Sequence, residues 1–267
     1  MPAETITLTE LAPYRDDRGN VIDYDGPPVT TKILVEFSGR DNVLRVDSTA
    51  KIGLLEARFD CNGGTMVVGA GGPWGQLRLA ARIGEEASVL IGEGVTSTSK
   101  CLVSAAEGST LRIGDDVMLA RDCRLRCDDS HPIFDIATSR RVNPAMDVTI
   151  GDHVWLGDHV MVLGGSSIDD GSVIGAVSLV KGRIPNNCIA TGSPARVVRR
   201  DIAWERPHLS MDRPYYKPDA SAIHTSPYWS PTRPSGDGLP EGDARVRPIR
   251  RRRLLSRVLN TIPRKRR

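Results

Sequence analysis

A six-residue repeat between residues 150 and 185 constrains the fold of this chain more than any other feature. Each unit opens on an aliphatic residue and carries a small or β-branched residue at its fifth place. The opening residues are Ile150, Leu156, Val162, Ile168, Ile174 and Val180. An amphipathic helix would repeat its apolar residues every three or four positions, and a half-buried strand every second position. A period of six predicts a three-walled parallel β-helix with about 18 residues in each coil.

The repeat is interrupted in one polar stretch. Units recur from residue 113 and Leu125 opens one of them, but the spacing from Leu125 to Ile150 is one residue more than four units. The phase therefore breaks, and we expect residues 128–147 to leave the column as a loop excursion. Loops held on rigid scaffolds are where binding and catalytic residues concentrate. A second, glycine-rich excursion is expected at residues 62–76.

The two ends of the chain differ from the repeat in composition. Residues 1–30 are polar and turn-rich, and we expect an N-terminal arm there, before a β-helix domain at residues 31–196. We expect residues 197–207 to form a short helix that caps the open coil end, because an uncovered strand edge invites pairing with other chains. Residues 208–243 predict an irregular linker, followed by a basic tail at residues 244–267. The predicted fold is thus all-β with a helical cap.

The basic tail holds eleven Arg and Lys residues and no acid, whereas the rest of the chain carries 25 basic and 33 acidic residues. The tail fits three interpretations: a solvated charge run, a segment lying on an anionic membrane surface, or a nucleic-acid-binding arm. Its lack of interleaved aromatic residues disfavours nucleic acid. An odd number of cysteines, five, has no zinc-like spacing, and neither a signal peptide nor a long apolar run is present. We expect a cytoplasmic protein, with contact at the inner face of the plasma membrane as a hypothesis.

Three features could bind or react. His131 lies in the polar excursion beside Asp129, and an imidazole can exchange a proton near neutral pH. An ordinary surface-loop histidine explains the same residue. Trp155 directly precedes an inward aliphatic residue and must point outward, toward a ligand or a neighbouring subunit. Gly157 and Gly175 should stack on neighbouring coils and form a lane free of side chains, where a ligand could lie close.

Several motifs follow one another in a fixed order. They are residues 129–133 (DSHPI), 141–143 (RVN), 150–157 (IGDHVWLG), 173–180 (VIGAVSLV), 184–187 (IPNN) and 192–196 (GSPAR). In these motifs the chain resembles the hexapeptide-repeat acyltransferases with a left-handed β-helix, and most of all the bacterial O-acetyltransferases of polysaccharides and sugars. The resemblance implies transfer of an acetyl group from acetyl-CoA to a sugar or polysaccharide hydroxyl by direct attack, without a metal. It also implies a homotrimer with each site between two columns.

The resemblance assigns roles to individual residues. It implies that His131 is the general base, that Asp129 and Trp155 belong to the catalytic site, and that Asn143 and Arg141 shape the acceptor pocket. The implied coenzyme contacts are Gly157, Gly175, Ala176, Ser178, Lys181, Pro194 and Arg196. The chain departs from its relatives at Val177, which replaces a glycine, and at Lys181, which stands one place earlier than the usual lysine.

Two other interpretations stay open. A β-helical scaffold without catalytic activity would use the same lane and tail for binding alone. A metal-dependent β-helical hydro-lyase would need converging histidines. His153 and His159 are one unit apart, however, and are expected on adjacent walls of one coil.

Overall fold

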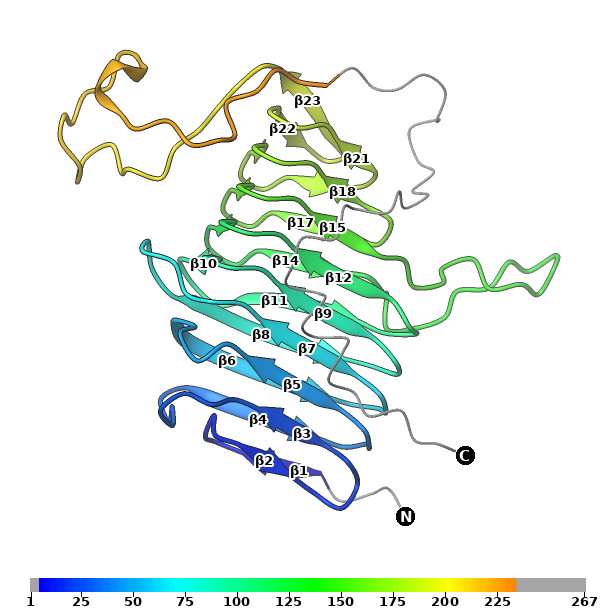
Figure 1. Ribbon diagram of the computed structural model, residues 1–267. Coiled ribbons are helices and arrows are strands. Elements are labelled where there is room, and N and C mark those ends of the chain that lie inside the picture. The colour runs from blue at the N-terminus through cyan, green and yellow to red at the C-terminus, as the bar shows by residue number, and fades with distance from the viewer. Residues whose placement is uncertain (1–4, 234–267) are drawn as a thin grey trace.

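The computed structural model describes residues 5–233 as a column of stacked coils with three β-sheet walls (Figure 1). From β10 onward each coil contributes one strand to each wall in turn, whereas the coils before it have strands in only two walls, and neighbouring strands within a wall are mostly parallel. The walls hold eight, six and nine strands. The parallel β-solenoid predicted from the six-residue repeat is therefore confirmed.

The eight-stranded wall contains β1 (Ile6–Leu8), β4 (Ile33–Phe37), β6 (Ile52–Phe59), β8 (Leu77–Ile83), β11 (Cys101–Ala105), β14 (Arg124–Arg126), β17 (Met161–Leu163) and β20 (Leu179–Val180). The six-stranded wall contains β10 (Thr96–Ser97), β13 (Met118–Leu119), β16 (Trp155–Leu156), β19 (Val173–Ile174), β22 (Ile189–Gly192) and β23 (Ala195–Arg199). The nine-stranded wall contains β2 (Tyr14–Arg15), β3 (Val21–Asp23), β5 (Val43–Val46), β7 (Thr65–Val68), β9 (Ser88–Ile91), β12 (Thr110–Ile113), β15 (Val148–Ile150), β18 (Ser167–Ile168) and β21 (Arg183–Ile184).

The core is the interior of the column. All six opening residues of the repeat are buried, whereas Trp155, next to the buried Leu156, is 37% exposed. The fifth-place serines are buried as well, because their hydroxyls reach the backbone of the next coil. Ser166 donates to the carbonyl of Val180 at 3.2 Å, and Ser172 to that of Pro185 at 2.6 Å. A small polar residue therefore suits this place as well as a β-branched one.

Coil length changes along the column. In the early coils Val35 pairs with Ala57, whereas in the regular repeat the partners Val162 and Val180 are closer together in sequence. The separation shrinks once more at the last coil, where Ile168 pairs with Ile184. The predicted coil length therefore holds in the regular repeat, whereas the early coils are longer.

The predicted cap helix at residues 197–207 is wrong. The chain turns back after Gly192, and β23 pairs with β22 in the antiparallel sense, so a strand covers the open edge of the six-stranded wall. Val197 and Val198 are β-branched and favour this extended pairing. Within residues 5–233 the only helix is η1, a 3₁₀ turn at Ala220–Ala222.

Two N-terminal expectations also need amending. Residues 65–68 of the expected glycine-rich excursion form β7, a regular strand of the nine-stranded wall, and the residues directly after it also bond to the neighbouring coils, as Gly71 N–H does to the Thr49 carbonyl. The expected N-terminal arm contributes β1, β2 and β3 to the walls. The end of the linker and the basic tail 244–267, with its proposed membrane contact, lie outside the described residues. Between residues 5 and 233 no helix is long and apolar enough to cross a membrane.

Gly-Asp pairs join the coils at one edge of the column. A Cβ on Gly114 would lie 2.6 Å from the backbone carbonyl carbon of Gly151. The Asp152 carboxylate of the next coil accepts the backbone N–H of Asp115 at 2.9 Å, and Asp170 repeats this toward Asp152 at 2.9 Å. The recurrent Gly-Asp pairs of the repeat therefore have a structural role, because they connect each coil to the next.

Candidate functional site

The column has three edges, and the residues singled out above lie on all of them. The excursion edge joins the eight- to the nine-stranded wall and includes residues 127–147, 164–166 and 181–182. The glycine edge joins the six- to the eight-stranded wall and includes residues 157–160 and 175–178. The strap edge joins the nine- to the six-stranded wall and includes residues 114–117 and 151–154.

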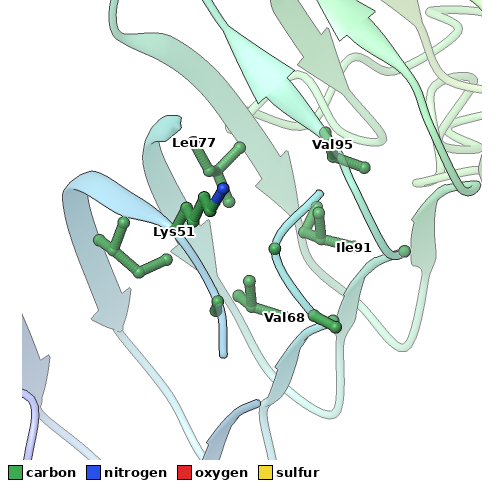
Figure 2. A pocket seen from close by; sticks show the side chains of 11 residues that line it. Lys51, Val68, Leu77, Ile91 and Val95 are labelled. Carbon is green, nitrogen blue, oxygen red and sulfur yellow. The ribbon is translucent and has the colours of Figure 1, made fainter. Parts of the chain in front are cut away.

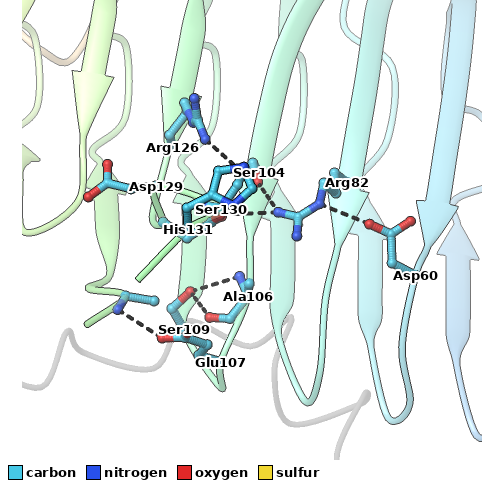
Figure 3. Close-up of polar contacts among 12 residues, drawn as sticks. Asp60, Arg82, Ser104, Ala106, Glu107, Ser109, Arg126, Asp129, Ser130 and His131 are labelled. Carbon is cyan, nitrogen blue, oxygen red and sulfur yellow. Dashed lines mark hydrogen bonds and ion pairs between the residues drawn. The ribbon is translucent and has the colours of Figure 1, made fainter. Parts of the chain in front are cut away.

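Residues 128–147 leave the excursion edge as a long projecting arm, as the phase break predicted (Figure 1). Its outgoing root is held by Asp128, which is 6% exposed. The Asp128 carboxylate accepts hydrogen bonds from Ser104 Oγ at 2.7 Å, Arg82 Nη1 at 3.1 Å and the Ser130 N–H at 2.9 Å. Figure 3 shows Arg82 bonded to Asp60 on one side and Ser104 on the other. Burial opposes ionisation of Asp128, but the Ser104 hydrogen bond and the Arg82 charge outweigh it and hold its pKa below the ordinary value.

The returning root of the arm is held by Glu107. Its carboxylate bonds Arg141 Nη1 at 2.6 Å and accepts the Ala145 N–H at 3.2 Å. The Arg141 hydrogen bond is the main reason that the pKa of Glu107 lies below its ordinary value. Arg141, predicted to shape the acceptor pocket, is thus committed to an ion pair and to the carbonyl of Asn143 at 3.0 Å.

Asn143 ties the two legs of the arm together around His131. Its side-chain amide donates to the Asp129 carboxylate at 3.0 Å and to the His131 carbonyl at 2.9 Å, and its oxygen accepts the Ile133 N–H at 2.7 Å. The His131 side chain is exposed, and no hydrogen bond to its ring is recorded among residues 5–233. In this single chain Asp129 therefore faces Asn143, and the histidine is held through its backbone.

The arm carries apolar side chains in exposed positions. Beyond its root the two legs pair through backbone hydrogen bonds, such as Val142 N–H to the Ile133 carbonyl at 2.9 Å. The exposed fraction reaches 99% at Ile136, and further exposed apolar residues are Ile133, Phe134, Val142 and Met146. Such a cluster on a projecting segment is typical of an interaction surface.

The glycines of the glycine edge do not form an open lane, contrary to the expectation. A Cβ on Gly157 would lie 2.8 Å from the backbone nitrogen of Ala176. A Cβ on Gly175 would lie 2.9 Å from Thr191 Oγ1 of the coil beyond. Close approach of the next coil, rather than space for a ligand, therefore requires these glycines. The outer surface of this edge is instead made by Ala176 and Val177, which are exposed.

The other predicted coenzyme residues divide between two edges and the column interior. Pro194 and Arg196 are exposed in the turn and strand that follow Gly192, next to the glycine edge. Ser178 is buried and receives the N–H of Gly192 at 3.1 Å, which fixes that turn. Lys181 is exposed and follows β20 on the excursion edge, away from Ala176.

Trp155 stands on the outer face of the six-stranded wall and meets a residue that the sequence did not point to. Its ring centroid lies 5.8 Å from that of Trp204, at an interplanar angle of 47°. Trp204 is only 8% exposed and lies in the segment after β23 that runs along the strap edge past His153 to Asp116. The expectation that Trp155 points outward is confirmed.

The predicted site residues do not gather in one cavity of a single chain. His131 lies on the excursion edge, whereas Ala176, Pro194 and Arg196 lie at or near the glycine edge. The hollow drawn in Figure 2, lined by Lys51, Val68, Leu77, Ile91 and Val95 among others, contains none of them. Residues 5–233 contain no cluster of three His, Cys, Asp or Glu side chains suited to a metal ion. His153 bonds Asp116, and His159 lies on a different edge.

Comparison with known proteins gives relatives that include O-acetyltransferases of polysialic acid. A polysialic acid O-acetyltransferase of Neisseria meningitidis is 30% identical over 188 residues, which are 70% of this chain and 86% of the relative. A polysialic acid O-acetyltransferase of Escherichia coli O1:K1 / APEC is 38% identical over 109 residues, covering 41% of this chain and 33% of the relative. The crystal structure of the polySia-specific acetyltransferase NeuO superposes with a TM-score of 0.61 at 28% identity, covering 73% of this chain and 94% of that one.

Two limits accompany these similarities. No protein-family model matches the chain. The chain also spans less than half the length of the first curated relatives that it matches, between 33% and 47%.

Proposed function

The chain belongs to the hexapeptide-repeat O-acetyltransferases, and from this premise we propose that it transfers an acetyl group from acetyl-CoA to a hydroxyl of a sugar or polysaccharide. The observation that carries the proposal is the match over 188 residues to a polysialic acid O-acetyltransferase, which includes 86% of that relative. The superposition on NeuO supports the same activity. The family relationship also leads us to propose a left-handed winding of the column.

The proposed reaction is a direct attack with both substrates bound. His131 takes the proton of the acceptor hydroxyl, whose oxygen attacks the thioester carbonyl carbon of acetyl-CoA. The carbon–sulfur bond breaks, and the coenzyme leaves as a thiol once it has received a proton from the histidine. A base in this role typically raises the rate by about 10²–10⁴-fold. The exposed ring of His131, free of protein hydrogen bonds among residues 5–233, suits a group that must reach a substrate.

Asn143 and Asp129 hold the backbone around His131 in this proposal. The Asn143 hydrogen bonds to the His131 carbonyl and the Asp129 carboxylate fix the backbone position from which the His131 imidazole projects. Positioning of this kind matters because reaction rates are steeply sensitive to the geometry of the reacting groups. Arg141 contributes by clamping the return leg to Glu107.

We further propose that the active protein is a homotrimer with each site between two columns. The excursion edge carries His131 and the glycine edge carries Ala176, so a second copy can bring one edge against the other. The exposed apolar arm, with Ile136 99% exposed, provides the surface that would cover the neighbour. In this assembly Gly157, Gly175, Ala176, Ser178, Pro194 and Arg196 shape the coenzyme side of the site. Lys181, on the excursion edge, would reach the coenzyme only from the opposite copy.

The base is tested with purified full-length protein, acetyl-CoA and a glycan panel that includes polysialic acid, by following the release of free coenzyme thiol. His131→Ala should lower kcat by about 10²–10⁴-fold while calorimetry shows unchanged acetyl-CoA binding. His224→Ala removes another exposed histidine and should keep the wild-type rate. Full activity of His131→Ala would disprove its role. Failure of the wild-type protein to bind acetyl-CoA would favour the scaffold without catalytic activity.

Subunit mixing tests the shared site. His131→Ala removes the base, and Ala176→Arg places a bulky charge on the exposed glycine edge. Each variant alone should be inactive. Refolding the two together should restore part of the rate, because some hybrid interfaces then join an intact His131 to an intact Ala176. A mixture as inactive as its components would exclude a site built from two copies.

A further inference from the structure

The strap edge holds a polar cluster that none of the proposed roles uses. We call residues 200–233 the strap: its two ends lie against the column, whereas the part between them projects away from it (Figure 1). Its first leg is fastened to the column through His153 and Asp116. His153 Nδ1 lies 2.6 Å from Asp116 Oδ2, and His153 Nε2 lies 2.9 Å from the backbone carbonyl oxygen of Trp204. Both partner atoms are oxygens that accept hydrogen bonds, and His153 is only 1% exposed.

This geometry fixes the number of protons in the cluster. A neutral imidazole has one N–H and one bare nitrogen. If His153 donated only to the Trp204 carbonyl, its bare Nδ1 would face an ionised carboxylate at 2.6 Å, lone pair against lone pair. Both contacts are satisfied only when the His153–Asp116 pair holds an additional proton. Arg206 Nη2 lies 2.9 Å from Asp116 Oδ1, so the second oxygen of this carboxylate also faces a donor.

The remaining groups around the ring suit an imidazolium. His153 is stacked between Trp204, at 4.1 Å between centroids, and Tyr228, at 4.7 Å. A cation gains from aromatic faces on both sides. Burial, followed by the charges of Asp152, Asp170 and further carboxylates, raises the pKa of Tyr228 to about 12, so the phenol is neutral. The charges nearest the ring are Asp116, in contact with Nδ1, and the Arg206 guanidinium beside it, and Asp115, Asp152 and Asp170 add negative charge around the stacked Tyr228.

The rest of the strap is tied down independently. Arg206 Nη1 donates to Thr96 Oγ1 at 2.7 Å, and the Asn187 side chain donates to the carbonyls of Ile202 at 2.9 Å and Tyr228 at 2.6 Å. Glu205 joins the two legs by accepting the Trp229 indole N–H at 2.6 Å. Loss of the proton at His153 would therefore loosen one point of the strap and leave the segment attached.

That point lies against Trp155, which the family resemblance assigns to the catalytic site. The Trp204 indole N–H donates to the His153 carbonyl at 2.9 Å, and its ring lies 5.8 Å from that of Trp155. Trp155 is 37% exposed on the outer face of the wall, and Trp204 is the aromatic neighbour recorded for it among residues 5–233. The two indole rings are therefore direct neighbours on the outer face of the wall.

We propose that Trp204 is a positioning residue, which sets the Trp155 ring for acetyl transfer, and that a proton held between His153 and Asp116 keeps Trp204 in place. The inference rests on the proposed function for its kinetic consequence only. Raising the pH removes the proton to solvent, breaks the contact between Nδ1 and the carboxylate or that between Nε2 and the carbonyl, and frees the Trp204 ring. Acid pH keeps the strap fastened.

The structural part is tested without turnover. Full-length protein is labelled with 5-fluorotryptophan, and the fluorine resonances are assigned with single Trp→Phe variants. On raising the pH from mildly acidic to alkaline, the Trp155 and Trp204 resonances should shift together with one midpoint, while exposed Trp74 should not follow. His153→Phe keeps a stacking ring but cannot hold the proton, so it should abolish this shared shift. Independent midpoints for the two resonances, or an unchanged shift in His153→Phe, would overturn the proposal.

The kinetic part separates positioning from stability. Trp204→Ala should lower kcat about tenfold with an unchanged KM for acetyl-CoA, measured well below its Tm, because the reacting geometry is disturbed while coenzyme binding is not. Trp204→Phe should recover most of the lost rate, and Trp74→Ala should leave the rate unaltered. A lowered Tm with unchanged kcat in Trp204→Ala would make Trp204 merely structural. Absence of turnover in the wild-type protein would count against the proposed function instead, because the resonance titration is read separately.

Discussion

Replacing Val177 tests how much the left-handed backbone at the glycine edge lowers the free energy of unfolding of this chain. Its φ is 58°, in the left-handed region, and its side chain is 72% exposed. For a residue with a Cβ this conformation costs roughly 1–2 kcal/mol. Replacement by glycine removes that cost, while the larger entropy of glycine in the unfolded chain returns about 0.5–1 kcal/mol. Little apolar burial is lost. Val177→Gly should therefore stabilise the protein by up to about 1.5 kcal/mol.

The assay is urea unfolding at a fixed protein concentration, with stability compared through the midpoint at equal m-value. Val198→Gly is the matched control, because Val198 is 61% exposed but lies in strand β23. There glycine brings only its entropic cost, and the control should be destabilised by about 0.5–1 kcal/mol. If both variants lower the midpoint equally, the strain assigned to Val177 does not exist.

Two further perturbations probe the coil contacts and the arm. Gly157→Ala should destabilise by about 1–3 kcal/mol, because its Cβ would meet rigid backbone at 2.8 Å, whereas Gly75→Ala, with its nearest neighbour at 3.6 Å, should be nearly neutral in the same unfolding assay. The pKa of Asp128 is lowered, so its stabilisation of the arm is present at neutral pH and is lost as the pH falls below about 4. The ratio of amide exchange rates in residues 128–134 between Asp128→Asn and wild-type protein should accordingly approach one on acidification; a ratio independent of pH would contradict this.

The column could be predicted because the aliphatic residues that repeat every six positions are the ones that the fold buries. Leu156 and Ile174 are fully buried, and the phase break after Leu125 located the arm. The cap could not be predicted in the same way. The sequence of residues 195–199 is compatible with a terminal helix or with a strand. The turn at Gly192, which places these residues against β22, makes them a strand.

Site residues were predictable by motif, whereas their partners were not. His131 and Asn143 stood out as motif residues, but the hydrogen bond from Asn143 to the His131 carbonyl joins the two legs of an arm. Glu107 precedes the arm by many residues, and nothing local links it to Arg141. Nothing in the sequence singled out Trp204. Its position is set by contact with His153, which is fifty-one residues away in sequence.

The two ends of the column differ in the number of residues per coil, and this difference limits how copies can associate. The first coils are long, as from Val21 to its partner Val43, and the last are short, as from Ile174 to its partner Ala190. Among the outermost strands, β1 and β2 at one end and β23 at the other run opposite to their neighbours, whereas β20 and β21 run parallel to theirs. A copy placed end to end on another would meet coils of different length and, in part of the walls, strands of opposite direction. Lengthwise fibre growth is thereby disfavoured, and the flanks of the column are left as the surfaces for assembly.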